Sequence, residues 1–247
     1  VKYALGWIPD KPDDGRDRKY FAAPRLIGLP SHVDLSPECC EVYDQGQIGS
    51  CAPNAATSAY RFALRKSGKP DFHGSRLFLY YIVRAMEGNV RSDAGSSIRD
   101  NFRALAKQGL CSEASWPYMP DQFRKHPAVR CYVEGMFHQA IEYRRVNQSL
   151  GDMKACLADG YPFVFGIPVY PSMMMEETAK TGHVPMPFPG EVEIGGHAIK
   201  AVGYDDATKL FKFKNSWGKW GAGGYGFLPY AYVARMASDC WTVRVVE

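Results

Sequence analysis

The sequence lacks any apolar run long enough to cross a membrane. A membrane-spanning helix needs about 20 predominantly apolar residues. The longest apolar stretch, from Tyr161 to Tyr170, is interrupted by Gly166 and Pro168. The net charge is only +4, and the basic residues are scattered rather than gathered into a stripe with aromatic residues. We therefore expect neither a membrane nor a nucleic acid as a partner.

The sequence also lacks the cysteine and histidine spacings typical of a structural metal site. It has 7 cysteines but no CxxC pair, and no Cys/His combination suits zinc. We expect no metal and no other cofactor. An odd number leaves at least one thiol unpaired, so two interpretations stay open: mostly buried free thiols, or up to three disulfides beside one reactive thiolate. The cysteines are Cys39, Cys40, Cys51, Cys111, Cys131, Cys156 and Cys240.

The composition is that of an ordinary globular protein. Of the 247 residues, 46% are hydrophobic and 23% are charged, which excludes disordered, collagen-like and coiled-coil chains. A chain of this length buries a sizeable core without disulfides, as one large domain or as two lobes. Residues 1–28 differ from the rest because they are polar and rich in proline and aspartate. We predict an extended arm there that packs on the body through Trp7 or covers part of it.

Helical patterns dominate the first part of the chain after this arm. Small apolar residues from Cys51 to Ala63 recur at helical spacing, and the segment ends at Gly68. We predict further helices over 75–88, 97–109 and 149–160, two of them opened by serine caps with an aspartate three residues later. Residues 147–149 also form a glycosylation sequon, but the cap alone explains Ser149.

Strand patterns dominate after residue 160. We predict strands over 162–169, 197–204, 209–215 and 241–246, and a long loop over 171–193 rich in methionine and proline. Loops of that length are uncommon unless they have a function, so this loop is a candidate rim of a binding site. Helices first and antiparallel strands second indicate an α+β fold with two lobes.

Cys51 is the candidate nucleophile because it lies at the start of a predicted helix. The helix dipole and the free backbone N–H groups at such a position stabilise a thiolate. The preceding turn, residues 45–50, is polar and contains glycine, so a ligand can approach its backbone closely. Gln45 supplies an amide donor, and an amide together with the nucleophile's own N–H is a usual oxyanion hole.

His197 is the candidate base among the 6 histidines. It follows Gly195 and Gly196 and opens an alternating strand, whereas His183 lies in the long loop and is a weaker candidate. If strands 197–204 and 209–215 form a hairpin centred near Asp206, Asn215 lies opposite His197. An amide that holds one imidazole nitrogen fixes the orientation of the ring. The other histidines, His32, His73, His126 and His138, lie in segments without special features.

These residues lie in motifs that resemble the papain-like cysteine peptidases. The motifs are 45–51 (QGQIGSC), 197–204 (HAIKAVGY), 215–218 (NSWG) and 224–226 (GYG), and 29–34 (LPSHVD) resembles the start of a mature enzyme. The resemblance implies a helical left lobe, an antiparallel β-barrel-like right lobe and an active-site cleft between them. It implies an arm over 1–28 as a possible short prosegment, and a peptidase domain over 29–247. The helical lobe would span about 45–145, and the β lobe about 160–247 plus the mature-like N-terminal segment.

The resemblance also implies roles for individual residues. Cys51 would be the nucleophile, His197 its partner, Asn215 the residue that orients His197, and Gln45 part of the oxyanion hole. The implied substrate-binding residues are Gly49, Ser50, Gly95, Ser96, Gly196 and Trp217, the last of which would also shield the His–Asn pair from water. Ile48 stands where the family usually has a cysteine and Ala52 where it has an aromatic residue, as in divergent microbial members.

The sequence therefore predicts a thiol peptidase that hydrolyses peptide bonds of a polypeptide substrate through an acyl-enzyme. Two alternatives remain: a catalytically silent binding protein of the same fold, or an amidase or transpeptidase with the same Cys–His chemistry. The arm either keeps the enzyme latent or braces one lobe. We expect a monomer, and the family resemblance favours a secreted or a lysosome- or periplasm-like compartment.

Overall fold

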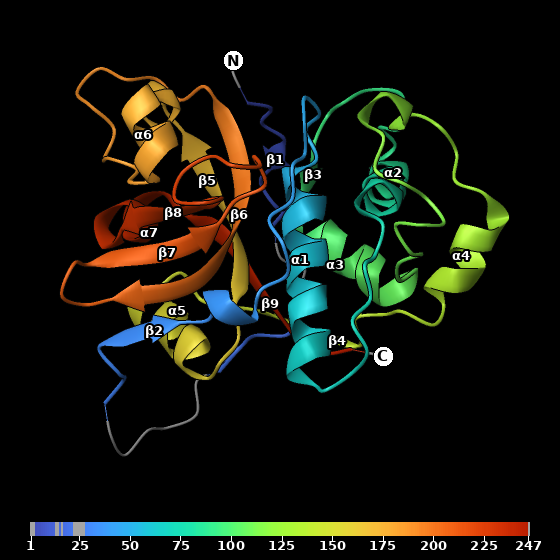
Figure 1. Ribbon diagram of the computed structural model, residues 1–247, viewed down its shortest axis with the longest axis horizontal. Helices are drawn as coiled ribbons and strands as arrows, with labels where there is room; N and C mark the ends of the chain where they lie inside the picture. The colour runs from blue at the N-terminus through green and yellow to red at the C-terminus, as the bar shows by residue number, and fades with distance from the viewer. Residues whose placement is uncertain (1–2, 13–14, 16, 22–27, 247) are drawn as a thin grey trace.

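A computed structural model describes residues 3–12, 15, 17–21 and 28–246. The helices before residue 140 lie on one side, with the first helix at its inner edge, and the main sheet lies on the other side together with the later helices (Figure 1). This is the α+β arrangement that the order of sequence patterns predicts.

The helical side consists of four helices, of which three follow the predicted boundaries closely. They are α1 (Cys51–Lys66), α2 (Arg76–Glu87), α3 (Ile98–Lys107) and the short α4 (Val129–Gly135). Ser75 caps α2 and Ser97 caps α3 by accepting a hydrogen bond from a backbone N–H three residues later. Gly88 ends α2 in the left-handed conformation.

Helix α1 lies at the centre of the molecule because small residues line it on several sides. Ala52, Ala56 and Ala59 are at most 2% exposed. Without large side chains, α1 packs against α2 and α3 on one side and against β6 (Gly195–Asp205) on the other. The structure thereby holds the start of α1, where Cys51 lies, directly against the sheet.

The main sheet has seven strands in the order β4-β9-β5-β6-β7-β8, with β2 paired to β6. The pairs within it are antiparallel. The remaining strands are β2 (His32–Asp34), β4 (Glu142–Arg145), β5 (Phe163–Val169), β7 (Leu210–Lys214), β8 (Tyr225–Pro229) and β9 (Ser238–Val245). Among the described residues β4 and β8 remain at opposite edges, so the sheet does not close into a barrel.

The predicted pairing of His197 with Asn215 across a ladder is wrong. The hairpin turn lies further along the chain than Asp206, and β6 pairs Asp205 with Leu210. A register shift between Ala201 and Gly203 then changes the pairing along β6. Lys214, the last residue of β7, pairs with Lys200, so Asn215 follows the strand and does not pair with His197.

The predicted loop over 171–193 contains regular structure that the sequence analysis missed. A 3₁₀ turn (Pro171–Met174) leads into α6 (Glu176–Thr181). Met173 is fully buried in the core, whereas Met175 is 48% exposed. Further short elements are α5 (Leu150–Ala158), α7 (Tyr230–Met236) and 3₁₀ turns at Ser36–Glu38 and Pro120–Gln122.

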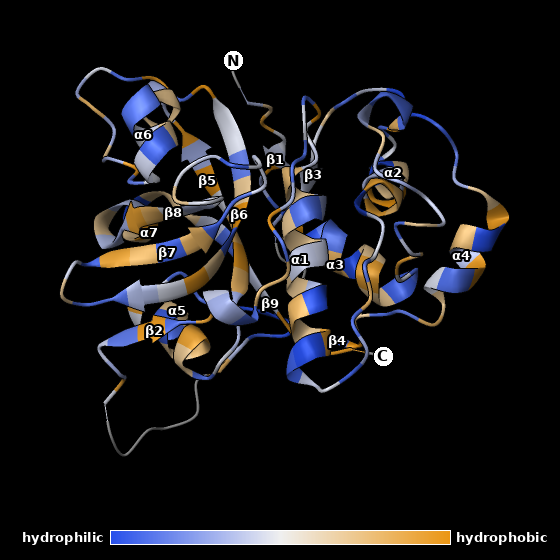
Figure 2. Cartoon of the chain, in the orientation of Figure 1, coloured by the Kyte–Doolittle hydropathy of each residue, from blue (hydrophilic) through white to orange (hydrophobic). Residues whose placement is uncertain are grey.

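The core divides into two large groups of buried side chains. One lies between the sheet and helices α5 and α7, and the other lies between α1, α2 and α3 and extends to β5 and β9. Figure 2 shows the apolar residues of β5 between the helices of the two sides. All seven cysteines are free thiols. Within the described ranges, no helix has the length and apolar character needed to cross a membrane.

The N-terminal arm is extended where the structure describes it. Its strand β1 (Trp7–Ile8) pairs in parallel with β3 (Ser96–Ser97) of the helical side. In Figure 1 this part of the arm runs beside the start of α1, between the two sides of the molecule. Residues 1–2, 13–14, 16 and 22–27 of the predicted arm lie outside the described residues.

Candidate active site

Cys51 is the first residue of α1, as predicted, and its side chain is fully buried. Burial raises the pKa of its thiol to about 11, although backbone N–H groups of Ala198 and Gly6 near the sulfur act in the opposite direction. Gly6 belongs to the arm, and Ala198 follows His197 on β6. The structure therefore brings the thiol beside β6, but in an environment that favours the neutral form.

His197 and Asn215 form a hydrogen-bonded pair despite the wrong predicted register. His197 Nε2 lies 2.8 Å from Asn215 Oδ1, which also accepts a hydrogen bond of 2.8 Å from the Ser216 backbone N–H. The ring of Trp217 stacks on His197 at 4.2 Å between centroids. His197 Nδ1 has no hydrogen-bond partner among the described residues. Burial lowers the pKa of His197 to about 4, while the hydrogen bond to Asn215 opposes this effect.

Gln45 places its side-chain amide beside the arm. Its Nε2 donates to the carbonyl oxygens of Ala4, at 3.1 Å, and Ile48, at 2.9 Å. Its Oε1 accepts a hydrogen bond of 2.7 Å from Ser216 Oγ, which fixes which way the amide faces. The phenol of Tyr118 donates to the Gln45 carbonyl oxygen at 2.9 Å. The amide thus already binds a carbonyl oxygen of the chain's own N-terminal segment.

Gly6 is the point at which the arm passes most closely between the two sides. Its N–H donates to the carbonyl of Gly196 at 3.0 Å, and its carbonyl accepts from the Ser96 N–H at 2.9 Å. A Cβ atom built on Gly6 would lie 2.0 Å from the carbonyl oxygen of Gly49. Only glycine fits this position without displacing backbone atoms.

Two aromatic residues of the arm flank Gly6. The ring of Tyr3 stacks on the ring of Trp217 at 4.6 Å between centroids, and Trp217 in turn stacks on His197. The indole of Trp7 lies against the backbone of Gly166 and Gly196, where a Cβ on either glycine would meet it. The arm therefore contacts the candidate site over its whole length from Tyr3 to Trp7.

The arm continues past the site and is held by buried acidic residues. Asp10 accepts hydrogen bonds from the Arg99 N–H, at 2.9 Å, and from Trp241 Nε1, at 2.8 Å. Burial, with the nearby carboxylate of Asp239, raises the pKa of Asp10 to about 6. Asp17 forms an ion pair of 2.5 Å with Arg99, in which both side chains are 4% exposed. These contacts fix the segment that follows Trp7.

The predicted substrate-binding residues divide into two groups. The first group lies against the arm and consists of Gly95, Ser96, Gly196 and Trp217. A Cβ atom on Gly95 would meet the carbonyl of Gly6. Gly49 touches the arm, but its N–H is already bound by Asp93 Oδ1 at 3.0 Å. The hydroxyl of Ser50 lies 2.5 Å from that of Tyr118, in a buried polar network.

Sequence analysis missed Tyr118, Ser216 and the arm residues Tyr3, Ala4 and Gly6. The two aromatic residues around a glycine were the available signal for the arm, and the motif 215–218 was the available signal for Ser216, whereas Tyr118 carries no sequence pattern of its own. The other histidines lie elsewhere: His183, for example, is exposed and stacks on Phe227. Within the described part of the chain, no group of His, Cys, Asp and Glu side chains could hold a metal ion.

Comparison with known proteins identifies the class of protein that this fold and site define. The model of the papain family of cysteine proteases matches residues 29–240. The chain therefore belongs to the papain family of cysteine proteases, and it is a cysteine-type peptidase. The family and the α+β fold that the sequence motifs predict are both confirmed.

Two relatives are similar over nearly the whole chain. An uncharacterized peptidase C1-like protein of Acanthamoeba polyphaga mimivirus is 40% identical over 271 residues, which cover 98% of this chain and 87% of the viral one. The crystal structure of xylellain, a cysteine protease from Xylella fastidiosa, matches with a TM-score of 0.93 at 39% identity, covering 100% of this chain and 97% of that one.

More distant structures share the fold. A procathepsin B of Trypanosoma congolense matches with a TM-score of 0.78 at 16% identity, covering 100% of this chain and 87% of that one.

Proposed function

We propose that this peptidase cleaves polypeptides through an acyl-enzyme on Cys51 and that its N-terminal arm keeps it latent. In this mechanism the thiolate of Cys51 attacks the substrate carbonyl, and His197 protonates the leaving amine. Gln45 Nε2 and the Cys51 N–H hold the oxyanion. Water then releases the product with His197 as base. The observation that carries the proposal is the Ala4 carbonyl bound to the Gln45 amide beside a buried Cys51.

The hydrogen bond between His197 Nε2 and Asn215 Oδ1 supports a role for Asn215 in orienting the imidazole. With Nε2 held as a donor at 2.8 Å, Nδ1 is the nitrogen left to exchange a proton with Cys51. Its lack of any other partner among the described residues agrees with that role. Trp217 covers the pair and limits the access of water to it.

The protonation states support latency. A thiol with a pKa of about 11 and an imidazole with a pKa of about 4 are both neutral at pH 7, so the reactive ion pair does not form while the arm is in place. In both groups burial is the main cause of the shift. Removing the arm admits water, which lowers the pKa of Cys51 and raises that of His197 towards their ordinary values.

The experiment compares alkylation of Cys51 in the full chain and in a chain that begins at Asp10. The shortened chain keeps Asp10, Asp17 and the fully buried Tyr20, which bind the body, and loses only the segment that covers the site. Both chains are treated at about pH 5 with a thiol reagent, where ordinary cysteines with a pKa near 8.5 react slowly. Modification of Cys51 is followed by peptide mapping, and hydrolysis of a fluorogenic peptide is measured in parallel.

We expect slow alkylation of Cys51 in the full chain and fast alkylation, with peptidase activity, in the shortened chain. The fast reaction should be lost when His197→Ala is introduced into the shortened chain. If the shortened chain is folded but Cys51 stays slow and no peptide is cleaved, the catalytic proposal is wrong. If the full chain is already as reactive and active as the shortened one, catalysis stands and latency is refuted.

A further inference from the structure

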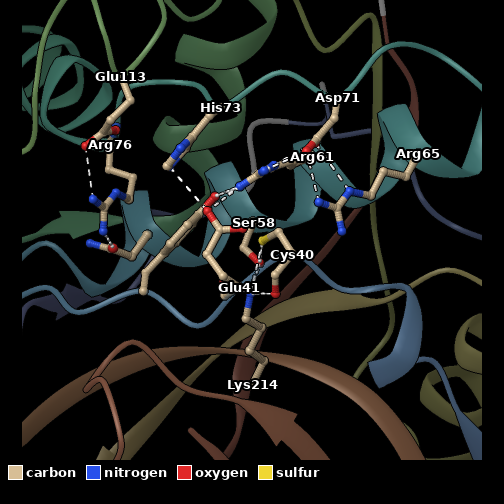
Figure 3. Close-up of polar contacts among 12 residues, drawn as sticks. Cys40, Glu41, Ser58, Arg61, Arg65, Asp71, His73, Arg76, Glu113 and Lys214 are labelled. Carbon is tan, nitrogen blue, oxygen red and sulfur yellow. Dashed lines mark hydrogen bonds and ion pairs between the residues drawn. The ribbon is translucent and has the colours of Figure 1, made fainter.

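A second thiol, Cys40, lies in a buried cluster of amino and hydroxyl groups apart from Cys51. Lys214 Nζ lies 3.0 Å from Cys40 Sγ, and it also donates to the carbonyl of Cys40 at 2.7 Å and to that of Glu41 at 2.6 Å. Ser58 Oγ lies 3.5 Å from the same sulfur. Figure 3 shows the Lys214 side chain reaching from below towards Cys40 and Ser58.

The cluster contains the amino groups of two buried lysines and, among the described residues, no carboxylate that pairs with them. Lys214 is 3% exposed, and a second lysine, Lys200, is 1% exposed and donates to the Ser58 carbonyl at 3.1 Å. The carboxylate of Glu41 turns away and pairs with Arg61 at 2.6 Å (Figure 3). The Cys40 sulfur is therefore the group within the cluster that can carry a compensating negative charge.

The charges prepare both groups for reaction with each other. Burial by itself raises the pKa of Cys40, but Lys200 and Lys214 outweigh it and lower the pKa to about 7. Burial and the charge of Lys200 lower the pKa of Lys214 to about 8, against the effect of Cys40. Near neutral pH, a thiolate therefore faces an amine that loses its proton easily.

A small cavity adjoins these groups. Its lining includes Ser58, Lys200 and Lys214, and it offers about 10 Å³ for the centre of a water-sized molecule. That is enough room for one such molecule. Hydrogen peroxide is an oxidant slightly larger than water, so this space beside Ser58 and Lys214 is where one molecule of it would approach the cluster.

We propose that Cys40 and Lys214 form a covalent sulfur–nitrogen link when the protein is exposed to a peroxide. The Cys40 thiolate attacks one peroxide oxygen, which gives a sulfenic acid and hydroxide, and the hydroxide takes a proton from the Lys214 ammonium. The neutral amine then attacks the sulfenic sulfur, and the hydroxyl group leaves with a proton from nitrogen as water. Thiolate, ammonium and peroxide thus give the link, and both peroxide oxygens leave as water, with sulfur oxidised and peroxide reduced.

Three other buried thiols, those of Cys111, Cys156 and Cys240, lack this arrangement. Burial raises the pKa values of Cys111, Cys156 and Cys240, and no lysine is a hydrogen-bond partner of theirs in the contacts described. The link would also connect two parts of the candidate site. Lys214 directly precedes Asn215, and Cys40 lies on the segment that leads to Gln45.

The experiment treats the full chain with hydrogen peroxide at pH 7.5 and maps its peptides by mass spectrometry. We expect a cross-linked peptide pair containing Cys40 and Lys214, with a mass about 2 Da below that of the two unmodified peptides. A thiol reductant should restore both peptides. Peptide mapping keeps oxidation of Cys51 separate, so the result does not depend on whether Cys51 is catalytic.

Two variants make the assignment specific. A disulfide between Cys39 and Cys40 would give the same loss of mass, so Cys39→Ser must retain the cross-link. Lys214→Arg keeps a positive charge but should lose the cross-link, and its Cys40 sulfenic acid should then react with dimedone. Should that variant not fold, dimedone added to the full chain during oxidation should trap the same intermediate and reduce the cross-link. The proposal is overturned if Cys40 stays unmodified or is found only as sulfinic acid, or if the loss of mass disappears in Cys39→Ser.

Discussion

Replacing Gly6 by alanine tests how the arm is held between the two sides of the molecule. Gly6 is bound on both sides by backbone groups, to Gly196 at 3.0 Å and to Ser96 at 2.9 Å. A Cβ atom there would lie 2.0 Å from the Gly49 carbonyl oxygen, far inside van der Waals contact. Because the obstructing atoms are backbone, the side chain cannot be accommodated by a rotamer change.

The expected magnitude follows from the cost of overpacking. Inserting a methyl group into a closely packed site costs about 1–3 kcal/mol. The added methyl group destabilises only the state in which the arm lies between the two sides. The ratio of chains with the arm in place to chains with the arm displaced should therefore fall by about 5- to 150-fold. If the docked state is the unreactive one, the rate of Cys51 alkylation should rise by up to the same factor.

The assay is the rate of Cys51 alkylation in the full chain, read by peptide mapping. Gly28→Ala is the matched control, because it lies in the same N-terminal region and an added Cβ meets nothing within 4 Å. Both substitutions remove a similar amount of backbone freedom from the unfolded chain. We expect Gly28→Ala to behave like the unmodified sequence. Equal alkylation rates in Gly6→Ala, Gly28→Ala and the unmodified chain would refute the reasoning.

Three further predictions concern other parts of the site. In the chain that begins at Asp10, Gln45→Ala should lower kcat/KM by about 10²–10³ while alkylation of Cys51 remains fast. Burial and the charge of Asp239 raise the pKa of Asp10 to about 6, so the protonated carboxyl group of Asp10 stabilises the fold. This stabilisation is complete below the ordinary pKa near 3.8 and is lost as pH rises through 6. Asp10→Asn should therefore flatten the dependence of Tm on pH in this range. Asp17→Asn should lower the free energy of unfolding in urea by about 3 kcal/mol, because Arg99 then stays buried without that carboxylate; an effect below 1 kcal/mol would contradict this.

Local signals in the sequence predicted the main helices well. The serines that cap α2, α3 and α5 and the glycine after α2 act within a few residues, so their effect is visible in the sequence alone. Short elements escaped prediction for the converse reason. Strand β4 (Glu142–Arg145) is a polar tetrapeptide, and β8 (Tyr225–Pro229) contains glycine and proline, so only pairing with neighbouring strands makes them strands.

The candidate site shows the same division. The motifs around Cys51, His197 and Asn215 identified the family, and the helix start at Cys51 follows from its local pattern. The contact between His197 and Asn215 was predicted from a strand pairing that the structure does not have. Strand β7 ends at Lys214, which pairs with Lys200 and not with a residue near His197, and the backbone after β7 still brings the Asn215 amide to the imidazole.

The sequence alone determined the fold class and the family, and it supplied the candidate catalytic residues, because these depend on periodicity, caps and short motifs. Only the tertiary structure decided what surrounds those groups. The contact of Lys214 with Cys40 joins residues 174 positions apart, and that of Gln45 with Ser216 joins residues 171 positions apart. Burial likewise raises the pKa of the Cys51 thiol, against the effect of the helix N-terminus, and lowers the pKa of His197. Contacts over such separations depend on how the whole chain packs, and no local pattern encodes them.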